Sequence, residues 1–224
     1  NAEFKVGTSK ITFTENQLHR IVLEYGEAIM HIQFIYNSYL KNTPWDIDFE
    51  LDLSKPGKVL TPQEHYLIGN ELQRNGIKLS SICLDPLKDA EAVNDNLQLH
   101  CEIADTFGYR LSFKNADIAM EDTAAAMKYL KGKVHFKMNN ILWMSAIELA
   151  KALDADLFGK LCAACGCEAT ADAADRALVL GYRKALNPKE EGNVAADMKA
   201  FLEAHHAEYA AAIKENVAAK LKNI

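Results

Sequence analysis

Three segments of the sequence alternate apolar residues with charged or polar ones, the pattern of strands that present one polar face. The first segment carries only carboxylates on that face, whereas the second and third carry cations and polar residues but no carboxylate. Because a buried charge is costly unless it is paired, we expect the carboxylates to face the cations in a shared space. The polar positions are Asp48, Glu50 and Asp52 in the first segment, Arg110, Ser112 and Lys114 in the second, and His135, Lys137 and Asn139 in the third.

Two interpretations of these polar faces remain open. One is a lattice of ion pairs that fills the interior of the fold. The other is a polar pocket for an anionic or polyhydroxylated ligand at the carboxyl ends of the strands, where parallel α/β folds bind their ligands. The residues at these ends are Asp52, Ser54, Lys55, Asp85, Lys114, Lys137 and Asn139.

The elements that position these side chains follow from periodicity and from caps. Thr14 caps a helix that is predicted to reach about Leu40. The Thr61–Glu64 segment is a capping box with proline at the first helical position, and Asn75-Gly76 ends that helix. Strands are predicted at 47–53, 77–84, 109–113 and 134–138, and further helices at 94–106 and 119–130.

The alternation of strands and helices indicates βαβ units, and therefore an α/β fold with parallel strands. A closed (β/α) barrel takes about 250 residues, whereas four strands precede an Ala-rich helical tail here. A barrel or partial barrel and a smaller open sheet both remain possible. We expect residues 1–158 to form a barrel-like segment, and residues 159–224 to form a helical C-terminal extension packed on it.

Composition excludes several classes of protein. The 224 residues include 25 Lys and Arg against 31 Asp and Glu, with no basic stretch, which argues against nucleic acid as a partner. No apolar run has the length of a membrane helix, and no signal-peptide pattern opens the chain. Five cysteines, an odd number, favour a reduced, cytoplasmic setting, and we expect the Cys162–Cys165 pair to be structural.

Four stretches together resemble the tagaturonate epimerase family: Asp48–Glu50, Thr61–His65, Glu71–Ile77 and Ile103–Ser112. The resemblance continues to Trp143 and fades after about Phe158. It implies a (β/α)-barrel fold and the interconversion of the ketohexuronates tagaturonate and fructuronate with the help of a divalent metal. The chain looks like the later part of a longer family barrel, so we expect either a homo-oligomer or an N-terminal half that precedes Asn1.

The resemblance also assigns site residues, because His65, His135 and Lys137 stand at matching family positions. On this basis we expect His135, Lys137 and Glu50 to act in catalysis. We expect the sugar acid to contact Lys55, Arg110, Lys114, His65 and Asn139.

The metal ligands are left open by the sequence. Ser54 and Lys55 stand where the family has an acidic pair, and Lys114 stands where it has a histidine. Ammonium groups repel a divalent cation, and His135 alone cannot hold one. Two functions therefore remain: a sugar-acid epimerase, and a catalytically inactive relative that binds a sugar acid or another anion.

Overall fold

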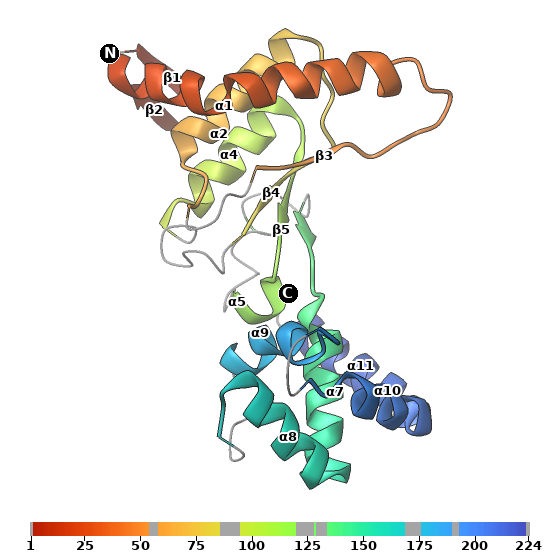
Figure 1. Ribbon diagram of the computed structural model, residues 1–224. Coiled ribbons are helices and arrows are strands. Elements are labelled where there is room, and N and C mark those ends of the chain that lie inside the picture. The colour runs from red at the N-terminus through yellow and green to blue at the C-terminus, as the bar shows by residue number, and fades with distance from the viewer. Residues whose placement is uncertain are drawn as a thin grey trace. The chain divides into compact units, whose positions relative to one another are not determined.

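The structure is a computed structural model that describes residues 2–53, 58–85, 95–119, 128, 134–168, 176–189 and 193–222. The chain divides into two compact units, Asn1–Lys137 and Met138–Ile224 (Figure 1). The boundary between the units falls after Lys137, whereas the barrel-like segment was predicted to end at residue 158. Within the described ranges, no helix combines the length and the apolar character that crossing a membrane requires.

A parallel four-stranded sheet forms the centre of the first unit, in the order β3-β4-β5-β6. All four predicted strands are present, and each is shorter than predicted because the ladders pair only the residues named below. The α/β class is therefore confirmed, whereas these four strands do not establish a closed barrel. The strands are β3 (Glu50–Asp52), β4 (Ser81–Leu84), β5 (Arg110–Phe113) and β6 (Val134–Phe136).

An antiparallel hairpin, which the sequence analysis missed, precedes the first helix. Its strands β1 (Ala2–Val6) and β2 (Ser9–Phe13) are joined by a two-residue turn in which Gly7 has a φ of 53°. The turn is hydrogen-bonded to helix α4 (Leu97–Phe107). The Glu102 carboxylate accepts from the Thr8 hydroxyl at 2.6 Å and from the Ser9 amide at 3.1 Å.

The helices of the first unit follow the predicted caps. Helix α1 (Glu15–Ile35) starts at a capping box formed by Thr14, and a π-helical turn η1 (Tyr36–Leu40) extends it. Helix α2 (Pro62–Arg74) starts at the predicted capping box and ends at the predicted position. Of the predicted helix at 119–130, only Ala119 and Lys128 lie within the described residues; Ala119 ends the short helix α5 (Ala116–Ala119).

One face of the sheet is apolar and belongs to the core of the first unit. Leu51, Ile82 and Leu111 stand in register across β3, β4 and β5, and all three are buried. They share a core with Ile68 of α2 and Ile103 of α4, both fully buried. Because side chains alternate along a strand, this packing leaves the polar residues on the opposite face.

The second unit is helical, as the Ala-rich sequence predicts (Figure 1). All five cysteines of the chain are free thiols, and three of them, Cys162, Cys165 and Cys167, lie in this unit. Its helices are α7 (Asn140–Leu153), α8 (Ala155–Cys165), α9 (Arg176–Ala185), α10 (Ala195–Ala204) and α11 (His206–Leu221).

Candidate functional site

The register of the parallel ladders puts the predicted polar side chains on one face of the sheet. Residues in register share a face, so each row across the strands collects side chains from distant parts of the sequence. One row is Glu50, Ser81 and Arg110, and the next, nearer the carboxyl ends, is Asp52, Cys83, Ser112 and His135. We call this surface, together with Lys114 and Lys137 directly after β5 and β6, the polar face.

Two ion pairs connect the strands across the polar face. The Lys137 ammonium group, which follows β6, donates a hydrogen bond to the Glu50 carboxylate on β3. The Lys114 ammonium group, which follows β5, donates to the Asp52 carboxylate on β3. Glu50 also accepts a 2.7 Å hydrogen bond from the Ser81 hydroxyl. The prediction that carboxylates of the first segment face cations of the other two is confirmed for these pairs.

These contacts keep the groups charged at neutral pH. Burial opposes ionisation of Glu50, but the hydrogen bonds from Lys137 and Ser81 outweigh it and lower the Glu50 pKa. The hydrogen bond to Asp52 raises the pKa of Lys114. Burial likewise disfavours the Lys137 ammonium, yet its bond to Glu50 raises the Lys137 pKa.

The centre of the polar face is buried beneath the ion pairs. Ser112 is completely buried. Cys83 lies beside it with its sulfur 3.8 Å from the Lys137 nitrogen. Burial raises the pKa of the Cys83 thiol, so this group stays protonated at neutral pH. His135, at the β6 end of the same row, is exposed.

Three other predicted site residues are not among the contacts described above. Arg110 is on the polar face but at the amino end of β5, where its side chain is exposed and forms no ion pair with any described residue. Asn139 belongs to the second unit. Lys55 lies outside the described residues.

His65 is buried on the helix side of the sheet, away from the polar face. Its Nδ1 lies 2.9 Å from Nδ1 of His100, and its Nε2 lies 2.8 Å from the hydroxyl of Tyr109. Burial lowers the pKa of both histidines, that of His100 to about 4, so both rings are neutral at pH 7. This contact was not predictable from local sequence patterns, because the partners are 35 and 44 residues away.

The donor atoms of the polar face do not fit a divalent cation. A metal site of carboxylates and imidazoles needs several free, negatively charged or neutral donors that converge. Here the Glu50 and Asp52 carboxylates are already bonded to ammonium groups. Across the described part of the chain, no three His, Cys, Asp or Glu residues are arranged so that they could hold a metal ion.

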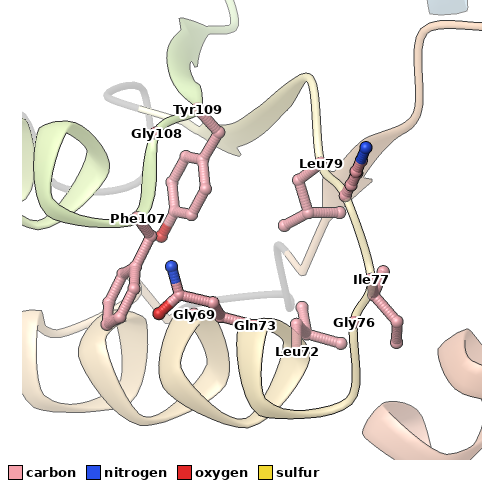
Figure 2. Close-up of a pocket in the computed structure, with 10 residues that line it drawn as sticks. Gly69, Leu72, Gln73, Gly76, Ile77, Leu79, Phe107, Gly108 and Tyr109 are labelled. Atoms are coloured by element: carbon pink, nitrogen blue, oxygen red, sulfur yellow. The ribbon is translucent and has the colours of Figure 1, made fainter.

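A cavity of about 420 Å³ lies at the opposite end of the strands, where β4 and β5 begin (Figure 2). It is bounded by the second half of α2, by residues 76–79 and by residues 107–109. Gly69 allows the two aromatic side chains of its wall to lie against α2, because a Cβ atom there would be 2.6 Å from the Phe107 ring and 2.7 Å from the Tyr109 hydroxyl oxygen. None of the predicted site residues lines this cavity.

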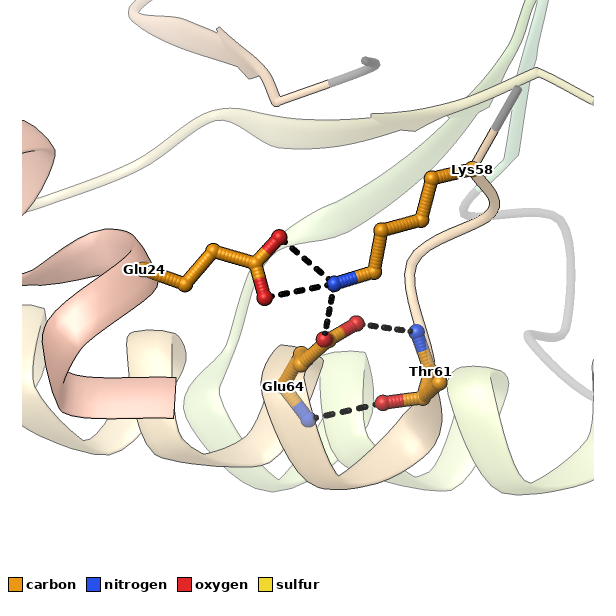
Figure 3. Close-up of polar contacts among 4 residues, drawn as sticks. All are labelled: Glu24, Lys58, Thr61 and Glu64. Carbon is orange, nitrogen blue, oxygen red and sulfur yellow. Dashed lines mark hydrogen bonds and ion pairs between the residues drawn. The ribbon is translucent and has the colours of Figure 1, made fainter. Parts of the chain in front are cut away.

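A second charged cluster, also missed from the sequence, fixes the segment between β3 and α2 (Figure 3). The Lys58 ammonium group lies 2.6 Å from the carboxylates of both Glu24 on α1 and Glu64 on α2. Glu64 is completely buried and also accepts the Thr61 amide hydrogen bond of the capping box, at 2.9 Å. Lys58 therefore joins α1 to the first turn of α2, the helix that covers the apolar face of the sheet.

Comparisons with known proteins agree with this fold. The model of the UxaE tagaturonate epimerase family matches residues 1–207, which is most of the chain. The chain therefore belongs to the tagaturonate epimerase family. A tagaturonate/fructuronate epimerase from Thermotoga maritima is 25% identical over 170 residues, which are 71% of this chain and 35% of that protein.

Solved structures show the same fold. Crystal structures of the fructuronate-tagaturonate epimerase UxaE from Cohnella laeviribosi, native and with one glycerol bound, superpose with a TM-score of 0.81 at 21% identity. Each match covers 99% of this chain and 54% of the Cohnella chain. The chain thus spans about a third of one relative and about half of the other.

Proposed function

We propose that the chain belongs to a ketohexuronate epimerase that acts on tagaturonate or fructuronate, and that the sugar acid binds on the polar face at the carboxyl ends of β3 to β6. The observation that carries the proposal is the pair of ammonium–carboxylate contacts at this end of the sheet, in a chain whose family match extends over 207 residues. In parallel α/β folds, ligands bind at this end.

The chemistry of the polar face suits a sugar acid. Such a ligand has hydroxyl groups that donate hydrogen bonds and a carboxylate that accepts them. The polar face offers the carboxylates of Glu50 and Asp52 as acceptors and the ammonium groups of Lys114 and Lys137 as donors. All four side chains are partly exposed, between 25% and 36%, so a ligand has access to them.

Epimerisation needs groups that accept and return a proton at the reacting carbon or its oxygen. We propose Glu50, whose pKa is lowered, as the base, and His135 as the second proton carrier. Lys137 orients the Glu50 carboxylate through its hydrogen bond. Lys114 binds the substrate carboxylate in this scheme, and Lys55 and Asn139 remain proposed substrate contacts. His65, which is buried on the helix side, is not included.

The polar face does not fit a divalent cation, and this observation favours a second function. In this alternative, the chain is a catalytically inactive relative that keeps the fold and binds a sugar acid or another anion. It shares the polar face with the first proposal and differs only in turnover. The two functions are therefore separated by an activity assay combined with a binding assay.

We also propose that the four strands are part of a (β/α) barrel. In the described part of the chain, β3 and β6 are edge strands with one neighbour each, and unpaired edges attract further strands. The additional strands would come from a second copy of this chain or from an N-terminal half. Sedimentation of the purified protein separates a dimer from a monomer. The five free thiols suit the reduced cytoplasm, which we propose as the location.

The assay follows the conversion of tagaturonate to fructuronate by the purified protein. We expect turnover, reduced by about 100-fold or more in Glu50→Gln and Lys137→Met, because each removes a proton carrier or the group that orients it. Lys78→Met is the control, since Lys78 lines the cavity at the amino ends of the strands and we expect this variant to keep its activity. Binding of tagaturonate without turnover would favour the inactive relative. If the protein neither binds nor converts tagaturonate, both functions are refuted.

A further inference from the structure

We propose that the polar face binds its ligand without a divalent cation, because Lys114 and Lys137 supply the positive charge that a metal ion would otherwise bring. This inference rests on the proposed function in naming a sugar acid as the ligand. It goes beyond that function because it states that two lysines of the chain take the place of a metal cofactor.

The contacts of the two lysines are those expected of built-in counter-ions. Each ammonium group is bonded directly to one carboxylate of β3, Lys137 to Glu50 and Lys114 to Asp52. The two carboxylates are the only acidic residues of β3. A divalent cation at this position would have to displace both ammonium groups from their partners and then remain close to them, which like-charge repulsion opposes.

The ion pairs leave bonding capacity for a ligand. An ammonium group has three N–H donors, so Lys137, which is bonded to Glu50 and lies 3.8 Å from the Cys83 sulfur, is able to donate to a second anion as well.

The first experiment concerns the metal alone and needs no substrate. The purified protein is stripped with a chelator and dialysed to equilibrium against Zn²⁺, Mn²⁺ or Ni²⁺. We expect Glu50→Gln and Asp52→Asn to leave the amount of bound metal unchanged, because neither carboxylate is a metal ligand. Binding of one metal ion per chain that either variant abolishes would overturn the proposal.

The second experiment is a calorimetric titration with tagaturonate. We expect the same Kd in chelator and in added Mn²⁺, a loss of at least about tenfold in Lys114→Met, and recovery of most of that loss in Lys114→Arg, which keeps the charge. Lys10→Met is the control, because Lys10 forms an exposed ion pair with Glu3 on the hairpin.

One further variant separates a binding lysine from a structural ion pair. Asp52→Asn removes the negative charge that the Lys114 ammonium group neutralises, so we expect tagaturonate to bind more tightly, whereas a purely structural pair would leave the Kd unchanged. Binding that disappears in chelator and returns with metal would overturn the inference and leave the proposed function intact. Failure of tagaturonate to bind under any condition would refute the proposed function, and the dialysis would still decide the question of the metal.

Discussion

Acidification is expected to destabilise the first unit through two histidines that are buried against each other. His65 and His100 share a 2.9 Å hydrogen bond between their Nδ1 atoms, so one ring must donate and the other must accept. If Tyr109 donates to Nε2 of His65, then His65 donates to His100, and only the Nε2–H of His100 lacks a partner. Protonating either ring removes an acceptor and places a charge in the core.

The magnitude follows from the difference in pKa between the folded and the unfolded chain. Burial lowers the pKa of His100 from 6.5 to about 4. The unfolded chain therefore takes up the proton first, so that stability is complete above pH 6.5 and decreases as the pH falls towards 4. By linkage, His100 alone removes about 2 kcal/mol of unfolding free energy between pH 7 and pH 5. His65, whose pKa is also lowered, adds to this loss.

Urea unfolding at pH 7, 6 and 5 measures the effect in the wild type and in His100→Gln. The glutamine side chain accepts the hydrogen bond from His65 but does not titrate, so the variant should lose about 2 kcal/mol less than the wild type over this range. His19→Gln, at an exposed position on α1, is the control and should follow the wild type. Equal losses in the wild type and in His100→Gln would refute the reasoning.

Two further predictions concern stability, and both are measured by urea unfolding at pH 7. Gly69→Ala is expected to cost about 1–3 kcal/mol, because its Cβ would lie 2.6 Å from the Phe107 ring, whereas Gly26→Ala, with open space around it, should gain up to about 1 kcal/mol. A stable Gly69→Ala protein would show that the ring moves freely. Lys58→Met leaves two carboxylates, one of them completely buried, without their cation, and should cost about 2–4 kcal/mol. The matched change Lys10→Met, at an exposed ion pair, should cost less than about 0.5 kcal/mol, and equal costs would contradict the argument.

Local signals in the sequence predict the elements that depend on neighbouring residues. The capping box from Thr61 to Glu64 predicts the start of α2 because both of its hydrogen bonds join residues three apart. Alternation likewise predicts which side chains share a face of each strand, and the polar face has the predicted members from Glu50 to His135. The N-terminal hairpin also has such a signal, since Phe4, Val6, Ile11 and Phe13 alternate around Gly7, although no strand was predicted before the helix that Thr14 caps.

The remaining features depend on which strands and helices become neighbours. Lys137 pairs with Glu50 across three ladders of the sheet, and the alternation of residues along a strand carries no information about strand order. The burial of His65 was not predictable for a similar reason. A histidine in an amphipathic helix suits a ligand site as well as a core, and only the packing of α2 against α4 brings His100 to it.

The most direct test of the proposed site is a crystal structure of the protein with tagaturonate bound. The account predicts the sugar acid on the polar face, with its carboxylate within hydrogen-bond distance of the Lys114 or Lys137 nitrogen. Tagaturonate bound instead in the cavity beside Gly69 and Tyr109, at the amino ends of the strands, would contradict it (Figure 2).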